Sequence, residues 1–150
     1  MRNNFPKHAQ IVIIGGGIMG CSTAYHLMKN GCRDVILLER AKLTSGTTWH
    51  SAAQVRQLRS TESLTKLVQN SVDLYSSLEE ETGQATGWKQ SGSLSIATNQ
   101  DRLTHIRRQA SLSKAFGIDA EEISVSDAAE KWPLMRTDDL IGTVYSPSDG

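Results

Sequence analysis

The 150-residue sequence contains only two cysteines and carries no net charge. Cys21 and Cys32 are too few and too far apart for a zinc cluster or a Cys-x-x-Cys redox pair, which predicts a reduced protein without a metal site. Sixteen Lys and Arg residues balance sixteen Asp and Glu residues. The charge therefore does not favour binding to nucleic acid or to an anionic membrane surface.

Long apolar runs are also lacking. The longest run, at residues 11–14, is far too short to span a bilayer. The first seven residues contain neither the apolar core of a signal peptide nor a long amphipathic presequence rich in Arg and Ser. We therefore expect a cytoplasmic protein without a membrane span, or a protein of the mitochondrial matrix if the source is a eukaryote.

The first forty residues predict a strand, a helix and a second strand in close succession. Residues 9–14 form a short apolar run that ends in glycines, which is typical of a strand buried on both faces of a parallel sheet. Apolar residues then recur at helical spacing up to Met28, and Asn30-Gly31 ends that helix. Because residues 34–39 form a second buried strand, the sequence predicts a βαβ unit with a right-handed crossover.

The remaining sequence is less regular. Residues 40–60 are polar and predict a loop that carries function, and residues 61–82 predict a long amphipathic helix that Ser60 caps and Gly83 ends. Alternating polar and apolar residues predict a strand at 93–97. Further expected elements are helices at 101–116 and 127–131 and a strand at 140–145. Since two parallel strands are too few for a stable sheet, we expect the chain to be part of a longer protein.

Three glycines after the first predicted strand have the spacing of a phosphate-binding turn. In Gly15, Gly17 and Gly20 the first glycine allows the tight turn, the second admits a pyrophosphate to the backbone, and the third lets helix and strand pack closely. The amino terminus of the helix then offers free N–H groups to the phosphates. Glu39 follows at the end of the second strand, where a carboxylate binds both hydroxyls of an adenosine ribose and repels a 2′-phosphate. The sequence predicts a dinucleotide site that disfavours NADP, but these residues do not distinguish NAD from FAD.

The loop after Glu39 has the sequence LTSGTTWH at residues 43–50. It resembles the flavin loop of the D-amino-acid-oxidase-like flavoproteins, and among them the sarcosine and dimethylglycine dehydrogenase group. Its form, with Thr-Gly-Trp at 86–88, is more similar to the sarcosine dehydrogenases. Other segments resemble this group at residues 78–83, 92–97, 132–135 and 148–150. The resemblance implies an FAD cofactor and an α/β fold, in which a Rossmann-like FAD-binding domain is followed by the beginning of a mixed β-sheet substrate domain in a truncated chain.

The resemblance also implies roles for individual residues. His50 matches the histidine whose imidazole is bonded to the 8α-methyl carbon of the flavin, and a neutral imidazole is a competent nucleophile near pH 7. The group usually has glycine at the position of Ala53, and a side chain there would displace the flavin ring or slow its attachment if the backbone must approach it closely. Two roles stay open for Trp49, namely contact with the flavin or ordinary packing of an aromatic side chain. The predicted cofactor-binding residues are Gly15, Gly17, Ile18, Met19, Gly20, Glu39, Arg40, Gly46, Thr47, Thr48, Trp49, His50, Ser51 and Ala52.

The chemistry that the resemblance implies is oxidative demethylation of an N-methyl amino acid, with sarcosine as the first candidate and dimethylglycine as the next. A hydride leaves the N-methyl carbon for flavin N5, and the resulting iminium gives formaldehyde or a one-carbon unit on tetrahydrofolate bound downstream. Electrons then pass to an electron-transfer flavoprotein or another acceptor. No catalytic residue is predicted within this chain. The predicted domain plan has the FAD-binding region at 1–85 and the start of the substrate domain at 86–150.

Two other functions stay open at this point. An NAD-dependent dehydrogenase would use the same glycines and Glu39, although the Thr-Trp-His loop argues against it. A non-catalytic regulatory relative would keep the fold without the oxidation. Such a relative is expected to lack the tethering histidine, so His50 disfavours it.

Overall fold

The computed structural model describes residues 6–150, and the chain divides between Ala53 and Gln54 into two compact units. The long helix predicted at 61–82 therefore belongs, by its contacts, to the second unit. The boundary at residue 85 concerns the domains of the whole protein and stays a prediction. None of the helices in the described part is long and apolar enough to cross a bilayer.

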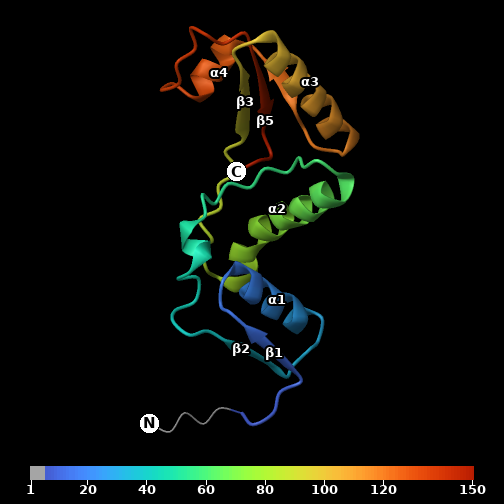
Figure 1. Ribbon diagram of the computed structural model, residues 1–150, viewed down its shortest axis with the longest axis vertical. Coiled ribbons are helices and arrows are strands. Elements are labelled where there is room, and N and C mark those ends of the chain that lie inside the picture. Colours follow the sequence, from blue (N-terminus) through green and yellow to red (C-terminus); the bar gives the residue numbers. More distant parts are fainter. Residues whose placement is uncertain (1–5) are drawn as a thin grey trace. The chain divides into compact units, whose positions relative to one another are not determined.

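The first unit is the predicted βαβ unit (Figure 1). It consists of β1 (Ile11–Ile14), α1 (Ile18–Lys29) and β2 (Val35–Leu38). The two strands are parallel, with Ile11 opposite Val35 and Ile14 opposite Leu38. Helix α1 ends at the Asn30-Gly31 pair because Gly31 adopts a φ of 89°, a left-handed conformation that favours glycine.

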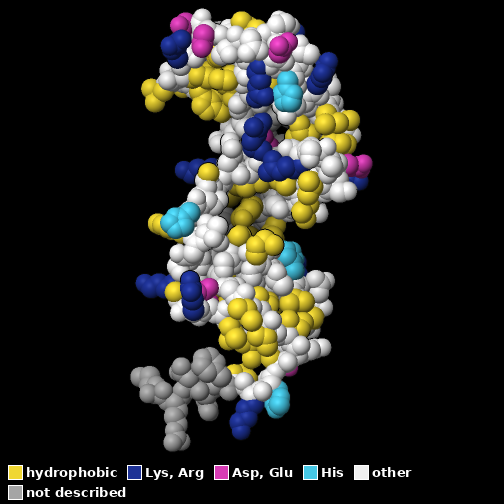
Figure 2. Space-filling view, in the orientation of Figure 1, with side chains coloured by type: hydrophobic (Ala, Val, Ile, Leu, Met, Phe, Trp, Pro, Cys, Tyr) yellow, Lys and Arg dark blue, Asp and Glu magenta, His cyan; other side chains and the backbone are white. Residues whose placement is uncertain are grey.

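One face of this small sheet carries exposed apolar side chains. Val12 and Ile14 are two residues apart on β1 and so point to the same face, where they are 51% and 87% exposed. Figure 2 shows hydrophobic side chains gathered at the surface over β1 and β2. Strands of a parallel sheet are normally covered on both faces, and the described residues leave this face uncovered.

The segment between β2 and the second unit is the expected loop, with one short helical turn in it. The turn is η1, a 3-10 helix at Thr47–His50, and the sequence did not predict it. Two residues that are not glycine have positive φ in this segment, Thr44 at 63° and Ala53 at 55°. Both conformations cost energy for a residue with a Cβ. The loop therefore has a defined backbone conformation that the surrounding structure must stabilise.

The second unit begins with α2 (Glu62–Thr82). Gly83 ends this helix in a left-handed conformation, as predicted. The predicted cap at Ser60 is wrong by one residue, because the Thr61 side chain accepts the hydrogen bond from the N–H of Leu64. Thr61 has the extended backbone that an N-cap requires and lies three residues before that donor.

The rest of the second unit is a three-stranded antiparallel sheet with helix α3 packed on it (Figure 1). The strand order is β3-β5-β4. Its core is formed by apolar side chains of the sheet, of α3 and of the turn after it: Ala97, Leu103, Ile106, Ala120 and Val144. The elements are β3 (Ser93–Ala97), α3 (Gln100–Ala115), β4 (Glu121–Ile123), α4 (Val125–Lys131) and β5 (Gly142–Ser146).

Three details of this unit differ from the sequence-based expectation. Strand β4 was not predicted. Helix α4 begins at Val125 and not at 127, because Ser124 and Asp127 form a capping box. Strand β5 covers residues 142–146 and not 140–145, in register with β3 such that Gly142 lies opposite Ala97.

Candidate functional site

The glycine turn between β1 and α1 is shaped by two of its three motif glycines. Gly15 adopts a φ of 106° and donates its N–H to the carbonyl of Leu38 at 2.8 Å. A Cβ on Gly20 would overlap the carbonyl oxygen of Gly15. The first glycine thus makes the turn and the third permits close contact between helix and strand, as the motif predicts.

Glu39 lies against the same turn. Its Oε2 accepts a hydrogen bond from the N–H of Gly16 at 2.7 Å, and its Oε1 accepts one from the N–H of Ala41 at 2.9 Å. These backbone donors, that of Gly16 first, hold the pKa of the Glu39 carboxyl below its usual value. A carboxylate offers about four lone-pair directions, more than these two donors occupy.

The loop after Glu39 is fastened to the glycine turn at two points. The N–H of Thr44 donates to the carbonyl of Gly16 at 2.8 Å. The hydroxyl of Thr48 accepts the N–H of Ile18, the first residue of α1, at 2.9 Å. Neither link was predicted from the sequence.

Together these segments form a groove on the first unit. Eleven of the fourteen predicted cofactor-binding residues line it: Gly15, Gly17, Ile18, Met19, Gly20, Glu39, Arg40, Gly46, Thr47, Thr48 and Ser51. Four more lining residues were missed by the sequence analysis, namely Ile14, Ala41, Thr44 and Ser45. The groove therefore brings the phosphate motif, the ribose carboxylate and the loop to one place.

Three of the predicted residues lie outside this groove, namely Trp49, His50 and Ala52. Trp49 is 78% exposed and His50 is also exposed. Both belong to η1, directly after Thr47 and Thr48, which do line the groove. Their roles toward a flavin stay predictions.

The groove suits a dinucleotide by the chemistry of its donors. Met19 and Gly20 belong to the first turn of α1, the positive end of the helix, and both line the groove. The Glu39 carboxylate, which favours ribose hydroxyls, lines the same groove. The turn has space for such a ligand because its glycines carry no side chain.

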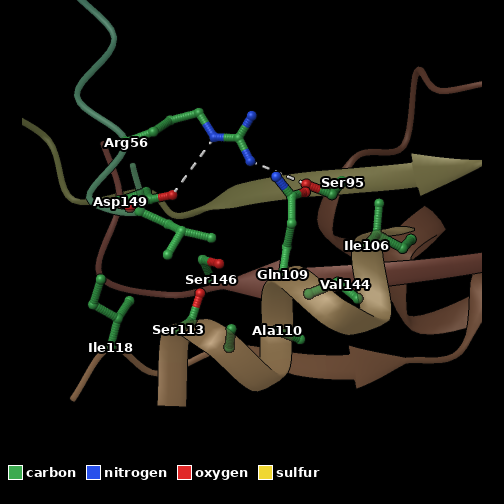
Figure 3. Close-up of a pocket in the computed structure, with 12 residues that line it drawn as sticks. Arg56, Ser95, Ile106, Gln109, Ala110, Ser113, Ile118, Val144, Ser146 and Asp149 are labelled. Carbon is green, nitrogen blue, oxygen red and sulfur yellow. Dashed lines mark hydrogen bonds and ion pairs between the residues drawn. The ribbon is translucent and has the colours of Figure 1, made fainter. Parts of the chain in front are cut away.

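A second, much smaller crevice lies in the other unit between α3, the sheet and residues 56–58 (Figure 3). Arg56 at its edge donates to the Ser95 hydroxyl at 3.0 Å and has its Nε 3.9 Å from Oδ2 of Asp149. The crevice has a volume of about 20 Å³, enough for about one water molecule and far too little for a cofactor. Asp149 is buried there, and no reasoning from the sequence had given it a role.

A parallel βαβ unit with a glycine turn, a carboxylate directly after the second strand and a groove lined by both is typical of a dinucleotide-binding α/β protein. The DAO family of FAD-dependent oxidoreductases matches residues 10–150, and the chain belongs to this family. This family match confirms the predicted fold class and the predicted FAD cofactor.

Several curated proteins are similar to this chain in sequence. The chain is 49% identical over 146 residues to sarcosine dehydrogenase from Mus musculus, a match that covers 97% of this chain and 16% of the relative. It is 44% identical to the pyruvate dehydrogenase phosphatase regulatory subunit from Mus musculus, over 96% of this chain and 16% of that protein. It is 40% identical to dimethylglycine dehydrogenase from Rattus norvegicus, over 95% of this chain and 17% of that protein. The chain thus spans about one sixth of these relatives.

Among solved structures, L-proline dehydrogenase from P. horikoshii matches with a TM-score of 0.89 at 29% identity, over 97% of this chain and 38% of that chain. The high score supports the arrangement of elements described above.

Proposed function

We propose that the protein to which this chain belongs oxidises an N-methyl amino acid with FAD, and that sarcosine is its first candidate substrate. The observation that carries the proposal is the 49% identity to a sarcosine dehydrogenase over 97% of the chain, against 40% for a dimethylglycine dehydrogenase. The groove supports it independently, because it combines donors for a diphosphate with an acceptor for a ribose.

In this proposal different residues of the first unit bind different parts of the dinucleotide. The glycine turn and the N–H groups of Met19 and Gly20 bind the diphosphate. Glu39 binds the adenosine ribose, and Arg40 lies beside it in the groove wall. Residues 46–52 wrap the flavin part, and His50 provides its covalent tether.

FAD, when bound, supplies the hydride acceptor for the N-methyl carbon of the amine. The substrate iminium that results would be hydrolysed to formaldehyde or captured by tetrahydrofolate in a downstream region. Electrons would leave to an electron-transfer flavoprotein or another acceptor. The sarcosine and dimethylglycine dehydrogenases compared above are mitochondrial by name, which supports a matrix location if the source is a eukaryote.

The tether is tested on the complete protein. We expect flavin fluorescence in the protein band of a denaturing gel after acid precipitation. His50→Ala should give a dark band and a yellow supernatant, while the control His105→Ala, an exposed histidine of α3, should keep the fluorescent band. A fluorescent band in His50→Ala would mean that the flavin is attached elsewhere. If neither the protein band nor the supernatant contains flavin, the NAD-dependent alternative would be favoured.

The substrate is tested by turnover with an artificial electron acceptor. We expect kcat/KM to be highest for sarcosine and lower for dimethylglycine. Glycine betaine, whose nitrogen has no lone pair to stabilise a developing iminium, should give no turnover. A higher kcat/KM for dimethylglycine than for sarcosine would contradict the proposed substrate and favour a dimethylglycine dehydrogenase.

One observation favours a second candidate function. The 44% identity to a phosphatase regulatory subunit exceeds the 40% identity to dimethylglycine dehydrogenase. A regulatory protein of this fold would bind FAD without oxidising amines. Flavin that stays oxidised with every N-methyl amine, in the absence of oxygen, would support this candidate over the dehydrogenase.

A further inference from the structure

The contact between Thr48 and Ile18 joins two segments that are 30 residues apart. Ile18 is the first residue of α1, and helix N-caps are normally provided by the residue just before the helix. Here that residue is Gly17, which has no side chain and makes no side-chain cap. The hydroxyl that caps α1 therefore comes from the loop.

This cap leaves a defined set of donors for a ligand. The first three amides of α1 belong to Ile18, Met19 and Gly20, and such amides have no acceptor within the helix itself. Within residues 6–150, the Ile18 amide has the Thr48 hydroxyl as its acceptor. The other two amides remain available to a diphosphate, so the loop and the ligand do not compete for the same donor.

The Thr48 hydroxyl lies close to the backbone of Gly17. A Cβ added to Gly17 would lie 3.1 Å from its Oγ1, closer than ordinary van der Waals contact. The Thr48 side chain is partly buried, whereas the neighbouring Thr47 side chain is exposed. A side chain at Gly17 would therefore crowd the Thr48 hydroxyl.

Thr48 also belongs to η1, the turn that carries Trp49 and His50. The carbonyl of Thr48 accepts the N–H of Ser51 at 3.2 Å, which closes this turn. The other cross-link of the loop is the bond from the Thr44 N–H to the Gly16 carbonyl. Of these two links, only the one at Thr48 depends on a side chain.

We propose that Thr48 is the positioning residue that holds the loop of residues 44–51 closed on the amino terminus of α1, before FAD binds and after it has bound. The inference rests on the proposed flavin site, because a closed loop matters for function only if FAD occupies the groove. The hydroxyl fixes η1, and with it His50, relative to the glycine turn.

The test is amide hydrogen exchange, resolved to Ile18 by mass spectrometry, on the complete protein without flavin. Thr48→Val, which keeps the shape but removes the acceptor, should lower the protection of the Ile18 amide and of residues 44–51 by about tenfold, the effect typical of losing a capping hydroxyl. Thr48→Ser should retain the protection. Thr47→Val is the matched control and should exchange like the unmodified protein. Equal protection in Thr48→Val and the unmodified protein would overturn the proposal.

The second measurement is made with FAD bound. Thr48→Val should release non-covalent FAD about tenfold faster in a His50→Ala background, where no tether masks the rate. Equal release rates with and without Thr48→Val in that background would overturn the claim that the cap persists once FAD is bound. A protein that binds no flavin contradicts the proposed function alone, since the exchange comparison without flavin still decides the role of Thr48.

Discussion

Oδ1 of Asp149 accepts a hydrogen bond from the backbone N–H of Gln57 at 2.9 Å, across 92 residues of sequence. Its Oδ2 accepts the hydroxyl of Ser93 at 2.6 Å, and the residue is only 3% exposed. Next to this contact, Val55 and Gly150 exchange two backbone hydrogen bonds, at 2.7 and 3.2 Å. The carboxylate therefore fastens residues 55–57 to the segment that follows β5.

Asp149→Ala should lower the stability of the second unit by about 3 kcal/mol. Each hydrogen bond to a charged acceptor contributes about 1.5–3 kcal/mol, and the change leaves a buried N–H without a partner. The measurement is the free energy of local opening from amide exchange of Gln57 in the complete protein. Asp139→Ala is the control, since Asp139 is an exposed partner of Arg136 at 3.8 Å and should change stability by less than about 1 kcal/mol. Equal effects of the two changes would contradict the assigned role of Asp149.

Gly20→Ala should prevent correct packing of α1 on β1. The added methyl group would overlap the backbone carbonyl of Gly15, which cannot move aside as a flexible side chain could. We expect a lower yield of soluble protein and loss of FAD binding, measured by flavin absorbance after purification. Gly46→Ala is the comparison for folding, because nothing lies within 4 Å of its Cβ and its φ is −93°. A Gly20→Ala protein with full FAD content would contradict the close packing described here.

Glu39→Gln should weaken FAD binding at neutral pH by about tenfold, since hydrogen bonds to a charged acceptor are the stronger kind. The amide also turns a donor toward one of the two backbone N–H groups, of Gly16 or Ala41, that the carboxylate accepts. The measurement is the dissociation constant of FAD for the flavin-free protein, from quenching of flavin fluorescence.

The lowered pKa of Glu39 predicts a pH dependence of the difference in stability between the unmodified protein and Glu39→Gln. A carboxyl whose pKa is lower in the folded state contributes stability above its unfolded value of about 4.5, and that contribution is lost as the pH falls through the folded pKa. The urea midpoints of the unmodified protein and of Glu39→Gln should therefore differ at pH 7 and converge as the pH falls below 4.5. A constant difference from pH 3 to pH 7 would contradict the assignment.

The elements that could be predicted from the sequence are those with local signals. The apolar spacing at residues 61–82 and the glycine at position 83 predicted the long helix, and the glycine motif predicted the turn after β1. Strand β4 has one apolar residue in three, and only its pairing with β5 makes it a strand. Such pairing is not visible in a local window.

The candidate site shows the same division. Glu39 and the glycines follow from their spacing within one βαβ unit. The bonds of Thr44 and Thr48 to the glycine turn depend on how an irregular loop folds back, for which the sequence has no periodicity. The role of Asp149 was missed because its donors lie far away in the chain, at residues 57 and 93.

Ala53→Gly should stabilise the protein by no more than about 1.5 kcal/mol. Alanine at a φ of 55° costs about 1–2 kcal/mol, and glycine relieves that strain. The greater freedom of glycine in the unfolded chain offsets about 0.4–1 kcal/mol of this gain. Ala53→Val should be destabilising by about 2 kcal/mol or more, because a β-branched side chain tolerates positive φ poorly. Thermal unfolding of the complete protein measures both, and equal melting temperatures for the alanine and valine forms would contradict the assigned conformation.

The left-handed backbone at Ala53 also bears on how related proteins are found by their sequences. The surrounding chain, including the bond from the Ala53 N–H to the Ser51 hydroxyl at 3.1 Å, is compatible with this conformation without glycine. The shape of this turn therefore does not require glycine at position 53. A search pattern that demands glycine three positions after His50 would pass over this chain, whereas one that also allows alanine there would retain it.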